Sequence, residues 1–423
     1  MRKFYNLFIK SEFLKNSYFL IGGSSSAVLI QALGSPFLTR LYSPTEFGIF
    51  ALFFSVVTFL SVIVTAKYEL TIILPKDDAD SAFLVLLSII AATVLSLITL
   101  CISAVIIFMN FFESDLWLYF VPFVCLFVGF FQSSCYWLIR QKRFRILASI
   151  RILQSVAIIA LSILFAFVLP RNFGLILGYA IGQLVASISI FMMVVKDVKV
   201  YWREANIAVL LKLIKRYKNF PLYSNLSGLI ESFAAQMPIF FLTAFFGKGV
   251  AGFYSLAQRV TRVPVSVIST AVGDVFRQKA SSEYAIRGEC RAIFIKVFLS
   301  LTALAIVPCI TFFFIAPYLF NLVFGAGWKV AGEYARILTG ILFLQFIVSP
   351  LSNMFIIAEK QKVDFAMQIY LIIVSVFSFW CGYYFFHSAK LALIFFTFAY
   401  STKYLFELFV SYRFSLGIRK GAN

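Results

Sequence analysis

The chain has 423 residues, of which 62% are hydrophobic and 13% charged, and 53 are phenylalanine. A soluble globular chain carries roughly twice that share of charged residues, so the composition excludes a soluble enzyme or a soluble binding module. The formal net charge is +19. Such an excess would suit a nucleic-acid partner unless the basic residues are distributed for another reason.

Apolar stretches follow one another along almost the whole chain. A transmembrane helix takes about 20 largely apolar residues, and about twelve such stretches occur near 18–39, 47–66, 82–109, 116–138, 146–169, 174–195, 221–246, 250–275, 293–324, 334–357, 364–386 and 391–412. Backbone polar groups in hydrocarbon must be bonded within their own segment, which forces helices. The sequence therefore predicts an all-α integral membrane protein with about twelve transmembrane helices, and we expect no enzyme activity.

The basic residues are distributed unevenly between the links. If the N-terminus is cytoplasmic, 27 of the 37 Lys and Arg residues fall in the tails, in the inner links or in the first turn of the span that follows an inner link. The outer links then hold Arg40, Arg171, Lys248, Lys329 and Lys390. This asymmetry is the positive-inside rule. It predicts that both termini are cytoplasmic, and it accounts for the net charge without nucleic acid.

The longest polar segment, 196–219, separates the sixth and seventh spans. It contains IAVLLKLIKRYKNF, in which apolar and basic residues alternate at helical spacing. Such a pattern is typical of a helix that lies on the inner leaflet, although a basic linker between two halves would read the same way. We divide the chain into an N-terminal six-helix lobe (1–199), an amphipathic basic linker (200–219) and a C-terminal six-helix lobe (220–423).

An internal repeat supports two related halves. LTRLYSPTEFGIFAL (38–52) aligns without a gap with LTAFFGKGVAGFYSL (242–256), at an offset of 204 residues. The flanking spans match in order, the first and second against the seventh and eighth. The repeat predicts two pseudo-symmetric six-helix lobes around a central cavity, an arrangement typical of transporters.

The repeat also separates shared architecture from candidate functional residues. Gly48 and Gly252 are identical in the two copies, and we expect each to permit a tight turn where the chain re-enters the membrane. Arg40 corresponds to Ala244, so the turn does not need an arginine. We therefore predict a substrate-binding role for Arg40. The alternative is an interfacial arginine that extends to the outer headgroups.

The eighth span carries two arginines on a small, polar face. Residues on this face recur at steps of four and three: Ser255, Arg259, Arg262, Ser266, Ser269 and Gly273. Small residues alone indicate close helix packing, but an arginine in mid-membrane costs on the order of 2.5–3.5 kcal/mol or more. We predict a cationic central cavity lined by the first, second, seventh and eighth spans, with Gln31 and Gln236 as further substrate-binding residues. Glu231 is either a coupling-ion site or the charge partner of an arginine.

Two other acidic motifs have structural interpretations. Lys403 and Glu407 are four residues apart in the last span, where they are expected to neutralise each other. Asp78-Ala79-Asp80 matches the D-x-D motif that binds metal nucleotides in many glycosyltransferases. However, it directly precedes an apolar helix, where acidic residues cap the N-terminus and complement the helix dipole. We prefer capping, and we expect no metal or cofactor site.

Six further stretches can be compared with known families: RLYSPTEFGIFAL, KYELTIILPKDDAD, NFPLYSN (219–225), QMPIFFL (236–242), GFYSLAQRVTRVPVSVI (252–268) and VFRQKAS (275–281). Together they resemble bacterial O-antigen and polysaccharide repeat-unit flippases of the multidrug/oligosaccharidyl-lipid/polysaccharide exporter superfamily. The resemblance covers essentially the whole chain. Lys67 stands before Tyr-Glu where an arginine is expected. The positive charge is kept there, but bidentate phosphate binding is put in doubt.

The resemblance implies a flippase in the bacterial inner membrane. It would move polyprenyl-diphosphate-linked oligosaccharides to the periplasmic leaflet by alternating access, for O-antigen, capsule or exopolysaccharide biosynthesis. Arginine forks bind diphosphate oxygens in pairs, so Arg40, Lys67, Arg259 and Arg262 are the predicted anion site. A polysaccharide polymerase and a chain-length regulator are candidate partners. The alternatives are a multidrug/cation antiporter, which would need an acidic cavity, and a membrane glycosyltransferase or polymerase, which would usually have a large outer loop.

Overall fold

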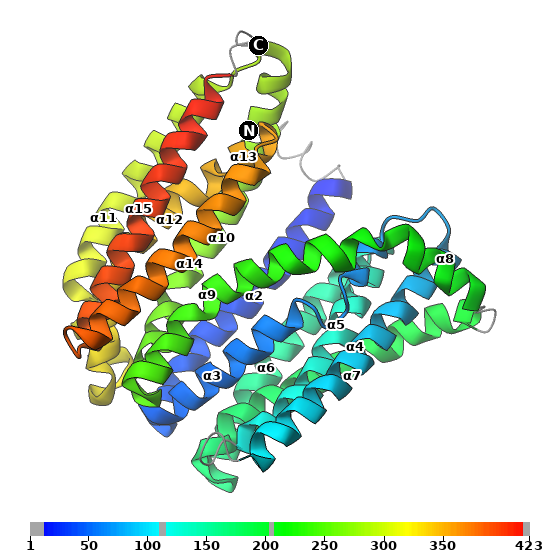
Figure 1. The fold of residues 1–423 in the computed structure, drawn as a ribbon, viewed down its shortest axis with the longest axis horizontal. Coiled ribbons are helices and arrows are strands. Elements are labelled where there is room, and N and C mark those ends of the chain that lie inside the picture. Colours follow the sequence, from blue (N-terminus) through cyan, green and yellow to red (C-terminus); the bar gives the residue numbers. More distant parts are fainter. Residues whose placement is uncertain (1–11, 110–115, 203–206, 418–423) are drawn as a thin grey trace. The chain divides into compact units, whose positions relative to one another are not determined.

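The computed structural model describes residues 12–109, 116–202 and 207–417, and every regular element within these ranges is helical (Figure 1). Twelve of the described helices are at least 18 residues long. They are α2 (Glu12–Leu41), α3 (Pro44–Ser61), α4 (Asp78–Phe108), α5 (Phe120–Arg140), α6 (Phe144–Val168), α7 (Arg171–Trp202), α9 (Asn225–Phe246), α10 (Lys248–Arg287), α11 (Arg291–Phe324), α12 (Lys329–Leu351), α14 (Gln361–Tyr384) and α15 (Ala389–Ser415). Each overlaps one predicted span, in order, so the predicted all-α class is confirmed.

Short elements connect the long helices. They are η1 (Tyr68–Thr71), η2 (Leu116–Tyr119), α8 (Ile207–Tyr217), η3 (Phe220–Ser224), η4 (Ala326–Trp328) and α13 (Met354–Ile357). In the described part of the chain, ten helical segments are long and apolar enough to cross a membrane. The two long helices outside this set are α2 and α10, and α10 carries the small, polar face noted in the sequence.

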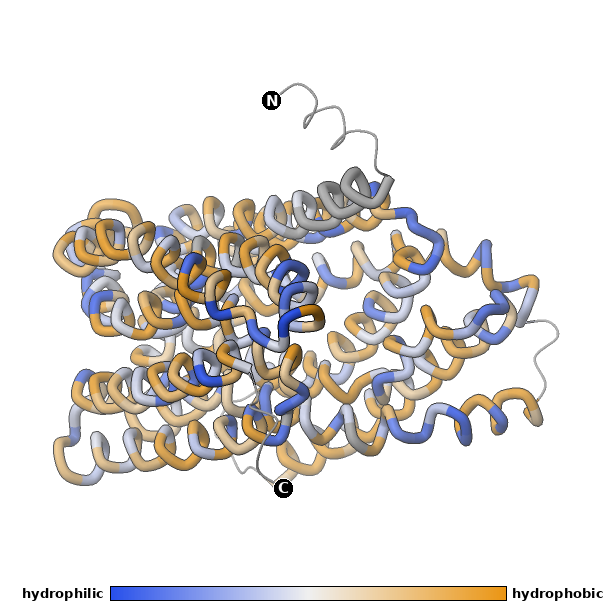
Figure 2. The backbone as a smooth tube through the Cα atoms, turned by 90° about the horizontal axis from the view of Figure 1, so that it is seen from above, coloured by the Kyte–Doolittle hydropathy of each residue, from blue (hydrophilic) through white to orange (hydrophobic). Residues whose placement is uncertain are grey.

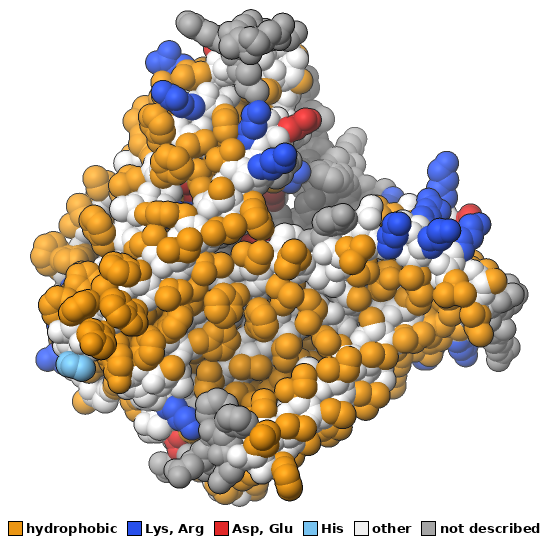
Figure 3. All heavy atoms as spheres, viewed as in Figure 1, with side chains coloured by type: hydrophobic (Ala, Val, Ile, Leu, Met, Phe, Trp, Pro, Cys, Tyr) orange, Lys and Arg blue, Asp and Glu red, His pale blue; other side chains and the backbone are white. Residues whose placement is uncertain are grey.

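Hydrophobic residues run along most of the helical length (Figure 2). On the face drawn in Figure 3, hydrophobic side chains form a nearly continuous cover, and most of the Lys and Arg side chains lie at its margins. Exposed apolar patches of this extent do not occur on soluble monomers. The protein is therefore a multi-pass membrane protein whose outer surface contacts lipid.

The chain forms two compact units. The first comprises Met1–Tyr42 and Leu52–Phe233, and the second comprises Ser43–Ala51 and Ala234–Asn423. The start of α3 thus belongs to the second unit, and α9 is shared between the two. The lobe boundaries at 199 and 219 stay a sequence prediction.

Glycines at four-residue spacing join α6 and α7 in the first unit. Gly174, Gly178 and Gly182 lie on one face of α7. A Cβ atom on Gly178 would lie 2.7 Å from the backbone nitrogen of Ser162, and one on Gly182 would lie 2.8 Å from that of Ile158. No side chain fits in such gaps, so the two backbones can touch only at glycine.

The amphipathic segment after the sixth span is helical, as α8. Its Leu213 and Tyr217 are buried in a core cluster with residues of α4, α5, α6 and α7. Ile207 and Leu211 stay exposed on the helix beside its lysines. An exposed apolar strip with neighbouring basic residues suits an interfacial helix, and contact with the inner leaflet stays a prediction.

The predicted role of Gly48 and Gly252 is wrong. Both residues lie inside helices, in the second turn of α3 and of α10, rather than at a turn. A Cβ on Gly48 would overlap the carbonyl of Lys248, and a Cβ on Gly252 would overlap the carbonyl of Pro44. Pro44 and Lys248 are themselves equivalent at the offset of 204, so the contact is reciprocal. These glycines are required because the starts of α3 and α10 touch each other. The contact is self-complementary, as it is for two elements related by a two-fold axis.

Candidate substrate-binding site

Arg262 lines a small cavity within the second unit. Residues of α9, α10, α12 and α15 enclose it, and its polar lining consists of Tyr254, Gln258, Thr261, Arg262, Gln345 and Tyr400. Tyr254, Gln258 and Arg262 follow each other at intervals of four residues, so one face of α10 supplies them. Gln258 Nε2 donates a hydrogen bond of 3.2 Å to the hydroxyl of Tyr254. Of the predicted stripe on the eighth span, Arg262 lines this cavity, and the other α10 lining residues are Tyr254, Gln258 and Thr261.

The cavity has room for water but not for a sugar. It offers about 40 Å³ to water-sized molecules, and one water needs roughly 10–15 Å³ of such space. Two amide side chains, two phenols and one guanidinium are enough partners to hold a few waters. Arg262 is exposed, and it shares the cavity lining with these polar side chains.

Arg259 has different surroundings from Arg262. Its guanidinium carbon lies 5.7 Å from the centroid of the Phe50 ring, which is within cation–π distance. Phe50 and Tyr254 are equivalent at the offset of 204. Arg259 therefore lies beside one residue of this repeat-related pair, and Arg262 lines the same cavity as the other. A planar guanidinium on an aromatic face keeps its edge available for bidentate binding of an oxyanion.

The other predicted residues are spread over the two units. Arg40 is exposed in the last turn of α2, and Glu231 is exposed on α9. Gln31 donates a hydrogen bond of 3.3 Å to Ser155 Oγ of α6, so it joins helices inside the first unit. Gln236 is half-buried on α9. Among the predicted substrate-binding residues, Arg259 and Arg262 share one helix face. The substrate-binding roles of all the predicted residues stay predictions.

Lys67 belongs to a strained segment between α3 and α4. Ala66 and Lys67 have φ angles of 50° and 60°, in a region that residues with a side chain rarely adopt and that is found where structure overrides local preference. Glu69 follows in η1 with 4% of its surface exposed, and it accepts a hydrogen bond from Thr65 Oγ1. Burial raises the pKa of the Glu69 carboxyl, while the bond from Thr65 and the charge of Lys67 oppose that rise. A Cβ on Gly228 of α9 would lie 3.7 Å from Lys67 Nζ, so this ammonium is held close to α9.

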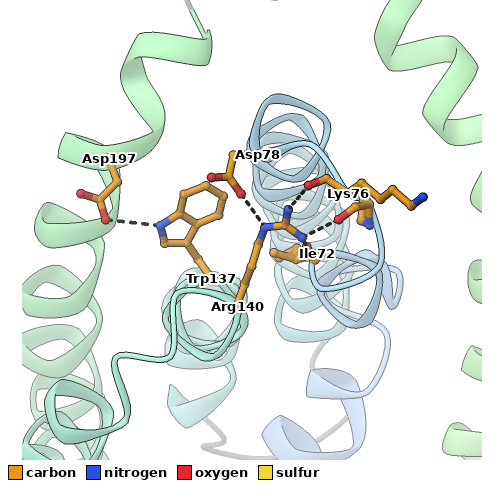
Figure 4. Close-up of polar contacts among 7 residues, drawn as sticks. Ile72, Lys76, Asp78, Trp137, Arg140 and Asp197 are labelled. Carbon is orange, nitrogen blue, oxygen red and sulfur yellow. Dashed lines mark hydrogen bonds and ion pairs between the residues drawn. The ribbon is translucent and has the colours of Figure 1, made fainter.

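Arg140, which the sequence did not single out, fixes the segment that follows η1 (Figure 4). Its Nε donates to Asp78 Oδ1 at 2.9 Å. Its two terminal nitrogens donate to the carbonyls of Ile72 at 3.2 Å, Pro75 at 2.7 Å and Lys76 at 3.1 Å. A guanidinium offers five N–H donors in a fixed fork, so one side chain at the end of α5 orders the whole link.

The acidic motif at the start of α4 has a structural role. Asp78 and Asp80 lie in the first turn of α4, and Asp78 pairs with Arg140. This placement agrees with the helix-start interpretation of D-x-D. The detail differs, because Asp77 stands at the N-cap without a capping hydrogen bond from its side chain. The predicted pair in the last span is confirmed, with Lys403 Nζ 2.5 Å from Glu407 Oε2 and both side chains buried.

Comparison with known proteins identifies the family. A family model described as a polysaccharide biosynthesis protein matches residues 37–333. No curated protein sequence matches the chain significantly.

Solved structures of three transporters share the fold. An inward-facing multidrug resistance MATE transporter of the MOP superfamily is 14% identical, with a TM-score of 0.71 over 93% of this chain and 94% of that chain. The lipid II flippase MurJ in an inward closed conformation is 13% identical, with a TM-score of 0.68 over 94% and 87% of the two chains. A MOP superfamily transporter from Pyrococcus furiosus is 15% identical, with a TM-score of 0.54 over 95% and 96%. The chain belongs to the polysaccharide biosynthesis protein family and has the twelve-helix fold of MOP superfamily transporters.

Proposed function

We propose that this protein is a flippase for polyprenyl-diphosphate-linked oligosaccharide repeat units in the bacterial inner membrane. The observation that carries the proposal is the pair Arg259 and Arg262 on α10, one beside an aromatic ring and the other on a water-sized cavity. Charged side chains within membrane spans mark substrate pathways. The family places the chain in polysaccharide biosynthesis, and MurJ, a flippase for lipid II, has the same fold.

The charge of such a substrate fits the charge of the site. A lipid diphosphate carries about two to three negative charges, and arginine binds such oxygens through paired, charge-assisted hydrogen bonds. Because the cell interior is negative, each negative charge moved outward is favoured by ~2.3 kcal/mol per 100 mV. Resetting an empty cationic site would be opposed by the same field. A coupling ion would relieve that cost, and Glu231 is the candidate for holding it.

A multidrug/cation antiporter is the second candidate, because multidrug transporters share the fold. Its cavity would need a carboxylate to attract a cation. Among the described residues that line the cavity in the second unit, the charged one is Arg262. The positive charge of Arg262 favours an anionic substrate. The antiporter alternative would regain support if organic cations bound to the purified protein more tightly than lipid diphosphates.

The function is tested in cells that depend on this chain for surface polysaccharide. Arg262→Ala and Arg259→Ala should leave the protein in the membrane, abolish surface polysaccharide and cause lipid-linked repeat units to accumulate on the cytoplasmic side. Lysine at either position should rescue only in part, because it supplies charge without the planar fork. Arg287→Ala, which removes an exposed arginine on the same helix, is the matched control. Normal polysaccharide in both alanine variants would exclude the proposal.

The rival role for the arginines is charge pairing with Glu231. If pairing alone matters, Glu231→Ala should destabilise the protein, and a double Arg262→Ala/Glu231→Ala variant should recover transport. If the arginines bind substrate, the double variant stays inactive.

The orientation is tested by reporter fusions. We expect fusions after Lys248 and Lys390 to be periplasmic, and fusions after Arg145 and Lys362 to be cytoplasmic, because basic residues concentrate on the inner side. Inversion of all four would reverse the proposed direction of transport.

A further inference from the structure

Arg336 is a charged residue of a membrane-spanning helix that the proposed site does not use. It is half-buried on α12, seven residues after the helix begins at Lys329. None of the described residues forms an ion pair or hydrogen bond with it. Glu333, one turn earlier, is instead paired with Lys390 at 3.1 Å. A cation in a spanning segment is normally neutralised or faces a functional pathway, so Arg336 points to an anion supplied from outside the chain.

A groove between α11 and α12 surrounds this arginine. It encloses about 510 Å³, and its lining includes Ile310, Phe313 and Phe314 of α11, with Gly340 and Phe343 of α12. Phe314 has 74% of its surface exposed, so the groove opens to the exterior, which in a spanning segment is hydrocarbon. Among its described lining residues, Arg336 is the one that carries a charge.

The packing of the two helices explains why the groove exists. At Gly332 the backbones touch, because a Cβ there would lie 2.7 Å from Pro317 Cα. Two turns later on α12, Gly340 contributes no side chain to fill the space beside α11. A second apolar groove, of about 340 Å³, lies in the first unit and is lined by residues such as Phe120, Leu169 and Phe173. Its described lining contains no charged residue, so it offers nothing to an anionic lipid.

We propose that the α11–α12 groove binds the isoprenoid chain of a polyprenyl diphosphate lipid, with a phosphate at Arg336. This inference rests on the proposed function and adds a second contact for the same substrate. A groove between two helices suits one chain better than the paired acyl chains of a phospholipid.

Photo-crosslinking of the purified full chain in nanodiscs tests the groove. A benzophenone amino acid replaces Phe314, and the probe is radiolabelled polyprenyl diphosphate without sugar. We expect Arg336→Ala to reduce labelling about five-fold or more and Arg336→Lys to retain part of it, since lysine keeps the charge but not the fork. Gly340→Leu, which fills the groove, should reduce labelling by a similar factor. A polyprenol probe, which lacks phosphate, should respond to Gly340→Leu but not to Arg336→Ala.

Matched controls separate binding from folding. Gly340→Ala adds a Cβ 3.6 Å from Thr397 Cγ2, an ordinary contact, so this variant should label normally. Leu299→Phe enlarges an exposed residue of α11 outside the groove and should also label normally. If Arg336→Ala does not accumulate, Arg336→Gln replaces it.

Two results would overturn the inference. One is labelling that is unchanged in Arg336→Ala and Gly340→Leu. The other is equal competition by phosphatidylglycerol, which would make the groove an ordinary phospholipid contact. Neither result touches the proposed function, which stands or falls on the accumulation of lipid-linked repeat units in cells with Arg262 variants.

Discussion

The two copies of the internal repeat share their helix contact and differ in their charges. Gly48 and Gly252 bring the starts of α3 and α10 together reciprocally. Farther along the same helices, Arg259 and Arg262 correspond to Ser55 and Thr58. One copy thus folds with small polar residues where the other has arginines. The shared positions serve the fold, and the unshared ones are where we place the function.

The copies also differ in how their second helices end. α3 ends at Ser61 and leads into the strained Ala66–Lys67 pair and η1, whereas α10 continues to Arg287. The residues that correspond to 67–71 are helical in the second copy. In the first copy, the segment from Ala66 to the start of α4 therefore replaces the helix found in the second copy. Arg140 and Glu69 stabilise this segment.

The largest expected effect belongs to the shared glycines. In Gly48→Ala or Gly252→Ala the new methyl group overlaps a backbone carbonyl that cannot move alone. Overpacking costs typically about 1–3 kcal/mol and occasionally more, and we expect the upper end here. Detergent-extracted protein measured by size-exclusion chromatography should show little folded material.

Gly249→Ala is the control for the glycine variants. Its Cβ would lie 3.5 Å from Thr45 Oγ1, an ordinary contact, so this variant should accumulate normally. Wild-type amounts of Gly48→Ala would show that the reciprocal contact is not needed for folding. The conclusion that the shared glycines serve the fold would then be wrong.

A smaller loss is expected from Arg140→Ala, which affects the first copy alone. The substitution leaves three carbonyls and Asp78 without their donor. Hydrogen bonds to charged groups are worth about 1.5–3 kcal/mol, so we expect a loss of about 2–3 kcal/mol in thermal or denaturant unfolding. Arg140→Lys should recover only part, because one ammonium cannot reach all four acceptors. Unchanged stability of Arg140→Ala would mean that the link is ordered by other contacts.

The smallest effect is a pH dependence from Glu69. Burial raises the pKa of this carboxyl in the folded protein, so the unfolded chain binds fewer protons than the folded one between the two pKa values. Stability from this group then increases as pH falls from neutral through the folded pKa. Glu69→Gln should remove that part of the pH dependence of the melting temperature. A wild-type slope in Glu69→Gln would contradict this assignment.

The spans could be read from the sequence because hydrocarbon leaves the backbone no alternative to helix. The glycines were misplaced because a residue without a side chain suits a turn and a helix contact equally well, and only the contact partner decides. Arg140 donates hydrogen bonds to backbone carbonyls 64 to 68 residues away. Every residue has a backbone carbonyl, so such partners cannot be recognised from the sequence. The sequence does not say which segments are in contact in the folded protein, and these positions depend on that contact.

The most direct test of the substrate-binding role of Arg262 is transport in proteoliposomes. Purified wild-type protein and Arg262→Ala are reconstituted with a fluorescent polyprenyl-diphosphate-linked oligosaccharide, and the fraction exposed to an added sugar-modifying enzyme is followed over time. We expect the wild type to bring the inner-leaflet lipid within reach of the enzyme, Arg262→Lys to do so more slowly, and Arg262→Ala to match empty liposomes. Equal transport by the wild type and Arg262→Ala would contradict a substrate-binding role for the arginine that distinguishes the second copy from the first.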